Sequence, residues 1–116
     1  MSQQYDFTIE QGATLAKTIT LKLDGAVFDL TDYEARLQAR CRDYDTDTVL
    51  SLTSDPPAGF TIQAENGIIL MEMLPEETEA LGFISARYNL ELYTAADTVV
   101  LRVLKGNIML SKEYAK

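Results

Sequence analysis

The chain has 116 residues, of which 47% are hydrophobic, and a formal net charge of −8. Its hydrophobic fraction is normal for a globular protein, and we expect one domain over residues 1–116. The negative charge argues against nucleic acid and anionic membranes as partners, because both present dense negative charge to a protein.

The residue types that carry most catalytic and metal chemistry are scarce. The sequence has no His, so the usual general base near neutral pH and the commonest metal ligand are both missing. A single cysteine, Cys41, excludes an intramolecular disulfide framework. No apolar run approaches the roughly 20 residues that span a bilayer, and residues 1–10 do not look like a signal peptide. We expect no enzyme activity, no cofactor and no membrane partner.

Alternation of apolar and polar residues predicts short strands along the first half of the chain, because each strand would bury one face. Asp24-Gly25 is a strong hairpin signal between two of them. Asp29 or Thr31 is expected to hold the next corner by accepting hydrogen bonds from nearby backbone amides. The predicted strands of this half are Tyr5–Gln11, Leu15–Leu23, Ala26–Leu30, Tyr33–Cys41 and Val49–Thr53.

The second half predicts further strands around one short helix. Asp55-Pro56-Pro57 interrupts the pattern, since proline cannot donate to a strand ladder. Asn66-Gly67 indicates a type I′ hairpin, and Pro75–Leu81 is typical of a short helix with proline at its start. We expect Gly106 to bulge the last strand. The predicted strands are Phe60–Ala64, Ile68–Leu74, Ile84–Tyr93 and Thr98–Leu110.

Seven to nine strands with one short helix near residues 75–81 indicate an all-β fold. Frequent turn signals and the lack of helix–strand alternation favour a single antiparallel β-sandwich, Ig-like or jelly-roll-like.

Acidic clusters are the first candidates for a site. Asp43, Asp45 and Asp47 have the spacing that opens a calcium loop, but Thr48 stands where that loop needs Gly. We interpret them as a solvated turn, with a weak calcium site as the alternative. The acids at 76, 77 and 79 suit the positive end of a short helix better than a catalytic carboxylate pair. We therefore predict no catalytic and no metal-binding residues.

One predicted strand separates its residues by chemistry. Arg36, Arg40 and Arg42 share a face, while Cys41 ends the opposite face, where we expect a small buried hydrophobe. The arginine side is either a wet face balanced by acids or a contact surface for an acidic patch on another molecule. The edge of the final strand is a second candidate surface. The candidate contact residues are Arg36, Gln38, Arg40, Arg42, Tyr93 and Arg102.

Six short motifs follow one another along nearly the whole chain. They are Glu10–Thr14, Asp29–Arg36, Asn66-Gly67, Leu74–Leu81, Arg87–Leu92 and Leu101–Gly106. In order and spacing they resemble a family of small β-sandwich proteins from the structural regions of tailed phages and prophages. Among the named members of that family are the N-terminal domains of upper baseplate proteins.

The resemblance implies a non-enzymatic virion component of the tail, baseplate, neck or head surface. Such a protein would be made in the bacterial host cytoplasm, reside in the virion, and bind other virion proteins and copies of itself. The alternative is a carbohydrate- or small-ligand-binding β-sandwich, in which tyrosines such as Tyr44 and Tyr93 stack on a ligand.

Overall fold

The computed structural model describes residues 3–23, 25–42, 47–55 and 57–112, and this part of the chain is mostly β-strand. One short α-helix and two 3₁₀ turns interrupt the strands there. The elements are β1 (Gln3–Gln4), β2 (Phe7–Glu10), β3 (Leu15–Thr20), β4 (Lys22–Leu23), β5 (Ala26–Val27), β6 (Glu34–Arg40), β7 (Leu50–Ser54), β8 (Pro57–Ala58), β9 (Phe60–Gln63), η1 (Ala64–Asn66), β10 (Ile68–Met73), α1 (Pro75–Glu79), β11 (Ser85–Tyr93), η2 (Ala95–Asp97) and β12 (Val100–Ser111).

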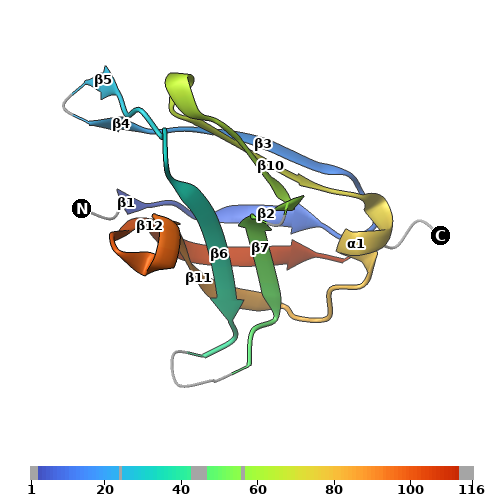
Figure 1. Ribbon diagram of the computed structural model, residues 1–116. Coiled ribbons are helices and arrows are strands. Elements are labelled where there is room, and N and C mark those ends of the chain that lie inside the picture. Colours follow the sequence, from blue (N-terminus) through green and yellow to red (C-terminus); the bar gives the residue numbers. More distant parts are fainter. Residues whose placement is uncertain (1–2, 24, 43–46, 56, 113–116) are drawn as a thin grey trace.

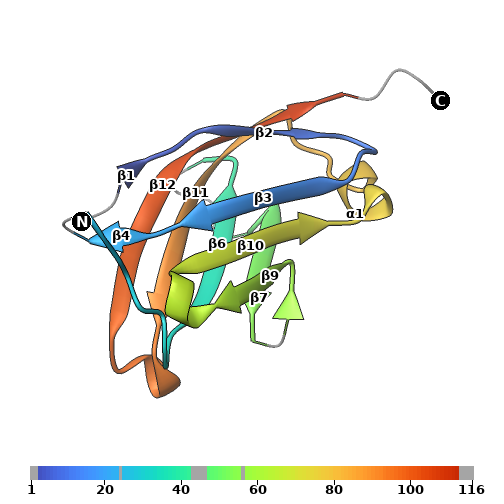
Figure 2. The same ribbon diagram turned by 90° about the horizontal axis from the view of Figure 1, so that it is seen from above.

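The strands form two main sheets. The larger has the order β1-β12-β11-β6-β7-β8, with β2 also paired to β12, and the smaller has the order β3-β10-β9. The smaller sheet lies across one face of the larger one, with α1 at one end of the molecule (Figures 1 and 2). The all-β prediction is confirmed, and so is the short helix at its predicted place.

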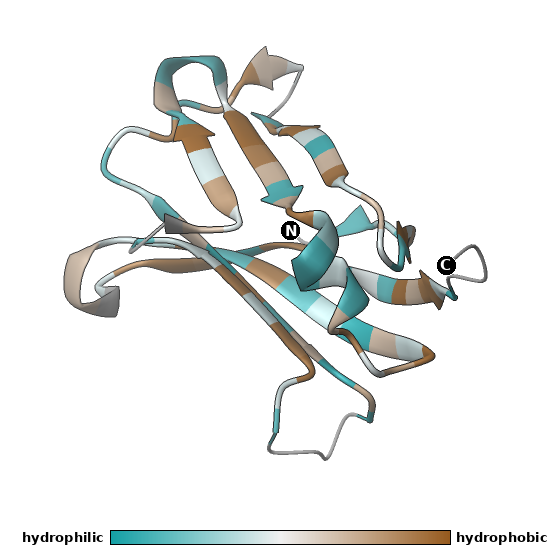
Figure 3. Cartoon of the chain, turned by 90° about the vertical axis from the view of Figure 1, so that its right-hand side faces the viewer, coloured by the Kyte–Doolittle hydropathy of each residue, from teal (hydrophilic) through white to brown (hydrophobic). Residues whose placement is uncertain are grey.

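The core fills the space between the two sheets. Hydrophobic and hydrophilic residues alternate along the strands, as the banded ribbon of Figure 3 shows. The inward positions predicted for β6 and β11 are buried, which confirms the alternation over both strands. Fully buried side chains of this core include Ile9, Leu30, Leu37, Ile69, Met71, Leu90, Leu92 and Ile108.

The prediction that all strands pair antiparallel is wrong for the N-terminal segment. β1 and β2 both pair in parallel with β12, with Gln4 opposite Lys105 and Ile9 opposite Leu110. These two strands therefore cover the side of β12 that faces away from β11. The predicted free edge of the final strand does not exist over this length, because the chain's own N-terminal segment occupies it.

A buried tyrosine holds this N-terminal segment in place. The Tyr88 hydroxyl donates a hydrogen bond of 2.5 Å to the backbone carbonyl of Tyr5. Gly106 lies directly opposite Tyr88 in the sheet, and a Cβ atom at Gly106 would collide with the same Tyr5 carbonyl. Glycine here permits close approach of the segment rather than the predicted bulge. The irregularity of β12 lies at Val103, the extra residue between partners of Leu90 and Glu91.

The helix is attached to the residues after β2 by two side chains, Thr78 of α1 and Gln11, whose amide donates to the backbone carbonyls of Glu79 at 3.3 Å and Leu81 at 3.1 Å. Thr78 in α1 is fully buried. Its hydroxyl accepts a hydrogen bond from the Gly12 N–H at 3.0 Å and donates to the Ala13 carbonyl at 2.8 Å. The helix also has the predicted N-terminal proline. Glu77 caps it by accepting a hydrogen bond from the Leu74 N–H at 2.8 Å.

Two of the predicted turns are confirmed and one is wrong in type. Strands β4 and β5 pair as the Asp24-Gly25 hairpin requires, although Asp24 itself lies outside the described residues. Asp29 accepts hydrogen bonds from the Thr31 N–H at 2.9 Å and the Thr31 hydroxyl at 2.6 Å. The hairpin at Asn66-Gly67 is closed by the 3₁₀ turn η1 with left-handed Gly67, instead of a two-residue type I′ turn.

Candidate functional site

All five arginines of the chain lie on one side of the molecule, over the outer face of the larger sheet. Three follow β6 and its end, one lies on β11 and one on β12, and Lys105 of β12 joins them. Because inward residues of these strands fill the core, the alternate residues necessarily face outward. We call this surface the arginine face; it consists of Arg36, Arg40, Arg42, Arg87, Arg102 and Lys105.

Strand register arranges these side chains in rows across the sheet. One row places Glu91 between Arg36 and Arg102, and Arg40 stands directly opposite Arg87 in another. The row between them contains the neutral pair Gln38 and Asn89, followed by Lys105. Like charges placed directly opposite each other across strands repel, as Arg40 and Arg87 are placed here.

Glu91 is the acidic side chain within these rows. Its Oε1 lies 3.1 Å from Arg36 Nε, and its Oε2 lies 3.8 Å from Arg102 Nη2. The Arg36 guanidinium also stacks over the Tyr93 ring, with Cζ 4.5 Å from the ring centroid. The Arg102 side chain remains 57% exposed. One carboxylate thus contacts two arginines, of which Arg102 stays largely exposed.

Two shallow hollows lie between these side chains. One, of about 170 Å³, is lined by Arg36, Gln38, Arg40, Asn89, Glu91 and Arg102. The other, of about 200 Å³, is lined by Gln38, Arg40, Arg42, Arg87, Tyr88, Asn89 and Lys105. Within the described part of the chain, the side chains of Arg40 and Lys105 have no ion-pair partner. Each hollow is large enough for a carboxylate group from another molecule.

The six contact residues predicted from the sequence all come together on or beside this face. Arg36, Gln38 and Arg40 project from β6, Arg42 lies just beyond its end, and Arg102 projects from β12. Tyr93 ends β11 beneath the Arg36 guanidinium.

Two residues of the face were missed from the sequence, Arg87 and Lys105. Alternation along β11 puts Arg87 on the same side as Asn89 and Glu91, and this pattern was a usable signal. The sequence carries no such signal for Lys105. The extra residue at Val103 shifts the alternation of β12, and this shift decides which face of the sheet Lys105 occupies.

The other candidate residues have different outcomes. Cys41 is exposed, one residue beyond the end of β6, so the prediction of a buried thiol is wrong. The strand pairing of β6 stops before it, and the inward alternation stops with the pairing.

Glu76 and Glu77 lie in the first turn of α1, as the structural interpretation predicted. Asp43 and Asp45 of the predicted acidic turn, and Tyr44, lie outside the described residues.

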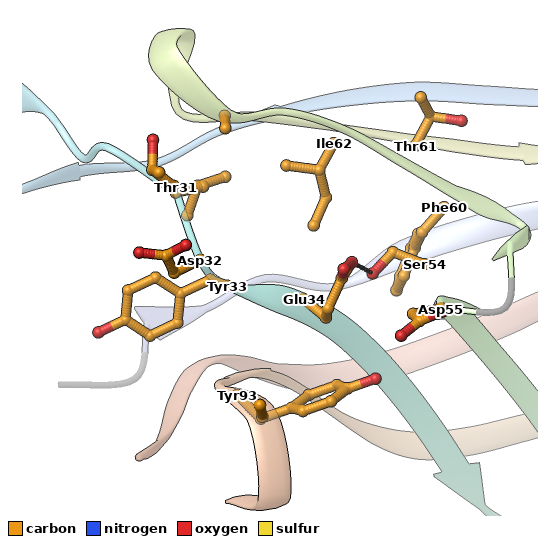
Figure 4. Close-up of a pocket in the computed structure, with 13 residues that line it drawn as sticks. Thr31, Asp32, Tyr33, Glu34, Ser54, Asp55, Phe60, Thr61, Ile62 and Tyr93 are labelled. Atoms are coloured by element: carbon orange, nitrogen blue, oxygen red, sulfur yellow. Dashed lines mark hydrogen bonds between the residues drawn. The ribbon is translucent and has the colours of Figure 1, made fainter. Parts of the chain in front are cut away.

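A groove of about 600 Å³ opens beside the start of β6 (Figure 4). Its walls come from β9 of the smaller sheet and from the ends of β6, β7 and β11. Ile62 points into the space from β9, with Tyr93 on the opposite side, while Asp32, Glu34 and Asp55 are distributed along it. The lining residues are Leu30, Thr31, Asp32, Tyr33, Glu34, Ser54, Asp55, Phe60, Thr61, Ile62, Ala64, Tyr93 and Ala95.

A scan against protein-family models found no match, and a search of curated proteins found none either. Among the described residues, no helix has the length and apolar content to cross a membrane. The candidate contact and binding surfaces of the molecule are therefore the arginine face and the groove.

Proposed function

We propose that this protein is a non-enzymatic structural or assembly component of a phage virion that works through protein–protein contacts. The observation that carries the proposal is the arginine face: a chain with net charge −8 places all five arginines on one sheet surface. The partner surface would be acidic, on another virion protein or a second copy of the chain.

The side chains of the arginine face are suited to pairing with the carboxylates of an acidic partner. Arginine carries a planar fork of N–H donors that pairs with carboxylates in a bidentate manner, and it keeps its charge at any physiological pH. Carboxylates inserted at the two hollows would reach Arg40, which lines both hollows and has no ion-pair partner among the described residues. Charge complementarity of this kind speeds association and excludes partners of the wrong sign.

The virion assignment rests on the resemblance of the six motifs, and it includes the finer fold class of an Ig-like or jelly-roll-like β-sandwich. A contact module needs a rigid sheet, a complementary surface and no reactive side chain. The absence of His from the sequence agrees with that role.

The alternative of a sugar-binding module has less support at the predicted tyrosine. The Arg36 guanidinium already stacks on the Tyr93 ring at 4.5 Å, so one face of that ring is occupied. A sugar would have to displace it or use the other face.

The test combines gene context with direct measurement of assembly. Mass photometry and light scattering would follow the purified protein alone and mixed with the products of the genes next to its own. The proposal expects salt-sensitive oligomers or complexes, and neighbouring genes for portal, tail-tube or baseplate proteins. A strict monomer that joins none of those products and binds a glycan array would overturn it.

A further inference from the structure

The groove beside the start of β6 has a lining that differs from the arginine face in sign. It contains three carboxylates, on Asp32, Glu34 and Asp55, and its lining includes no Lys or Arg. A volume of about 600 Å³ lies within the range typical of ligand sites. The groove is therefore a second surface to which the proposed contact function assigns no role.

Most of the remaining lining is apolar or aromatic. Leu30 and Phe60 are buried, and Ile62 projects into the space from β9 (Figure 4). Tyr33 and Tyr93 supply two ring walls. The Tyr33 ring is fixed by an edge-on contact with Phe28, at 5.9 Å between ring centroids. A ligand that fills this groove would bury an apolar body as well as a charged group.

Among the residues that the structure describes, no basic side chain forms an ion pair with the carboxylates of the groove. Glu34 Oε1 accepts a hydrogen bond of 2.7 Å from the Ser54 hydroxyl, which orients the carboxylate and leaves its second oxygen available. Within the described residues, neither Asp32 nor Asp55 forms an ion pair through its side chain. Three negative charges along one groove repel each other, and a bound cation would relieve that repulsion.

The molecule itself contains an example of the arrangement that such a cation would adopt. Arg36 lies over the Tyr93 ring at 4.5 Å and pairs with Glu91 at 3.1 Å, so an aromatic face and a carboxylate hold one guanidinium together. The groove lining contains the same two kinds of group, the Tyr33 and Tyr93 rings and the carboxylates of Asp32, Glu34 and Asp55. Aromatic faces attract cations, and nearby carboxylates strengthen that attraction.

We propose that the groove binds an organic cation with an apolar body, such as an alkylguanidinium or alkylammonium group. An arginine or lysine side chain of a partner protein and a free amine both carry this chemistry. A neutral sugar would use the aromatic walls but would leave the three carboxylates uncompensated. This inference does not depend on the arginine face.

The direct test is a titration of the whole protein with butylguanidinium, followed by two-dimensional amide NMR. The neutral compound pentanamide, of similar shape, serves as the matched ligand. We expect saturable shifts at Tyr33, Thr61 and Tyr93 with butylguanidinium and none with pentanamide. Equal binding of both compounds would overturn the proposal, as would shifts that map outside the groove.

Paired variants test whether the carboxylates are responsible. The triple variant D32N/E34Q/D55N should bind butylguanidinium about tenfold more weakly, because each lost charge removes part of the attraction. Its control is E10Q/E72Q/E76Q, which changes net charge equally at three exposed positions outside the groove lining. The control should bind like the wild type. Equal losses in both triples would contradict a specific site.

Two additions keep the test decisive. If the triple variant loses its folded NMR spectrum, the single variant Asp55→Asn replaces it, because Asp55 is exposed and its carboxylate has no ion pair among the described residues. A short Gly/Ser peptide with one arginine forms a second arm. Tighter binding of the peptide than of butylguanidinium assigns the cation to a partner protein, and tighter binding of the small compound assigns it to a free amine.

Discussion

The arginine face and the groove are neighbours with opposite chemistry. In the described part of the chain, the first gathers six basic side chains and has Glu91 as the acid lining its hollows, and the second gathers three carboxylates with no Lys or Arg in its lining. Tyr93 belongs to both, since it supports Arg36 and also lines the groove. The net charge of −8 therefore describes neither surface, because each surface has a local charge of its own.

The largest effect is expected from a core substitution that destabilises the fold and therefore both surfaces. Leu37 is fully buried on the inner side of β6, between two residues of the arginine face. Leu37→Ala should lower the free energy of unfolding by about 2–5 kcal/mol, because it leaves a cavity under the strand. Chemical denaturation measures the change. Gln38→Ala, one residue away on the exposed side, is the control and should stay close to the wild type; similar losses for both would contradict the assigned faces.

A smaller effect is expected where the N-terminal segment borders the arginine face. Tyr88→Phe removes the donor to the Tyr5 carbonyl and should cost about 0.5–1.5 kcal/mol of stability. Burial raises the pKa of Tyr88 above its ordinary value of 10.0, and the nearby Tyr5 and Asp6 raise it further.

The sign of the pH effect follows from that shift. The unfolded state loses the Tyr88 proton before the folded state does, so stability falls as pH rises through and above 10. Wild-type protein should therefore lose more stability than Tyr88→Phe in alkaline unfolding curves. Parallel curves for the two proteins would show that Tyr88 is not the titrating group.

A change at Glu91 sharpens the contrast between the surfaces. Glu91→Gln removes the acid that pairs with Arg36 and Arg102, so the face becomes more positive while stability changes by about 0–1 kcal/mol. Glu72→Gln makes the same net-charge change at an exposed position of β10. Cation-exchange chromatography should retain Glu91→Gln longer than Glu72→Gln. Identical retention would mean that the arginine face is not the dominant basic surface.

The smallest effect concerns the corner that leads into β6. The Thr31 hydroxyl and then the Thr31 N–H lower the pKa of Asp29 below its ordinary value of 3.8. That contribution to stability is present above the unfolded pKa and is lost as pH falls through the folded pKa. Thr31→Val removes the hydroxyl donor, so the pKa of Asp29 should rise toward 3.8 in an NMR titration. An unchanged pKa would show that the backbone amide alone sets it.

Local patterns predicted most of the fold and the centre of the arginine face. Alternation along one strand assigned Leu37 to the core and Arg36 and Arg40 to the surface, because a strand's two faces follow directly from its sequence. The face on which Lys105 lies could not be predicted from the sequence pattern, because one extra residue at Val103 shifts the alternation of β12. The parallel pairing of β1 and β2 was missed for a different reason, because it depends on contacts between opposite ends of the chain.

The groove could not be predicted from any single stretch. Its lining combines the corner before β6, the ends of β7 and β11, and one face of β9, which only the packing of the two sheets brings together. Tyr93 was predicted as a contact residue, but Asp32, Glu34 and Asp55 carry no local sign that they share a space. Sequence alternation therefore assigns faces, while sites between sheets need the three-dimensional structure.

The most direct test of the proposed contact function compares two lysine reversals. Lys105→Glu places a negative charge within the arginine face, and Lys22→Glu makes the same net-charge change at an exposed position on β4. Mass photometry would measure assembly of each variant with itself and with the products of neighbouring genes. We predict that Lys105→Glu loses the complexes while Lys22→Glu keeps them. Equal assembly of both variants would contradict the proposal that the arginine face is the contact surface.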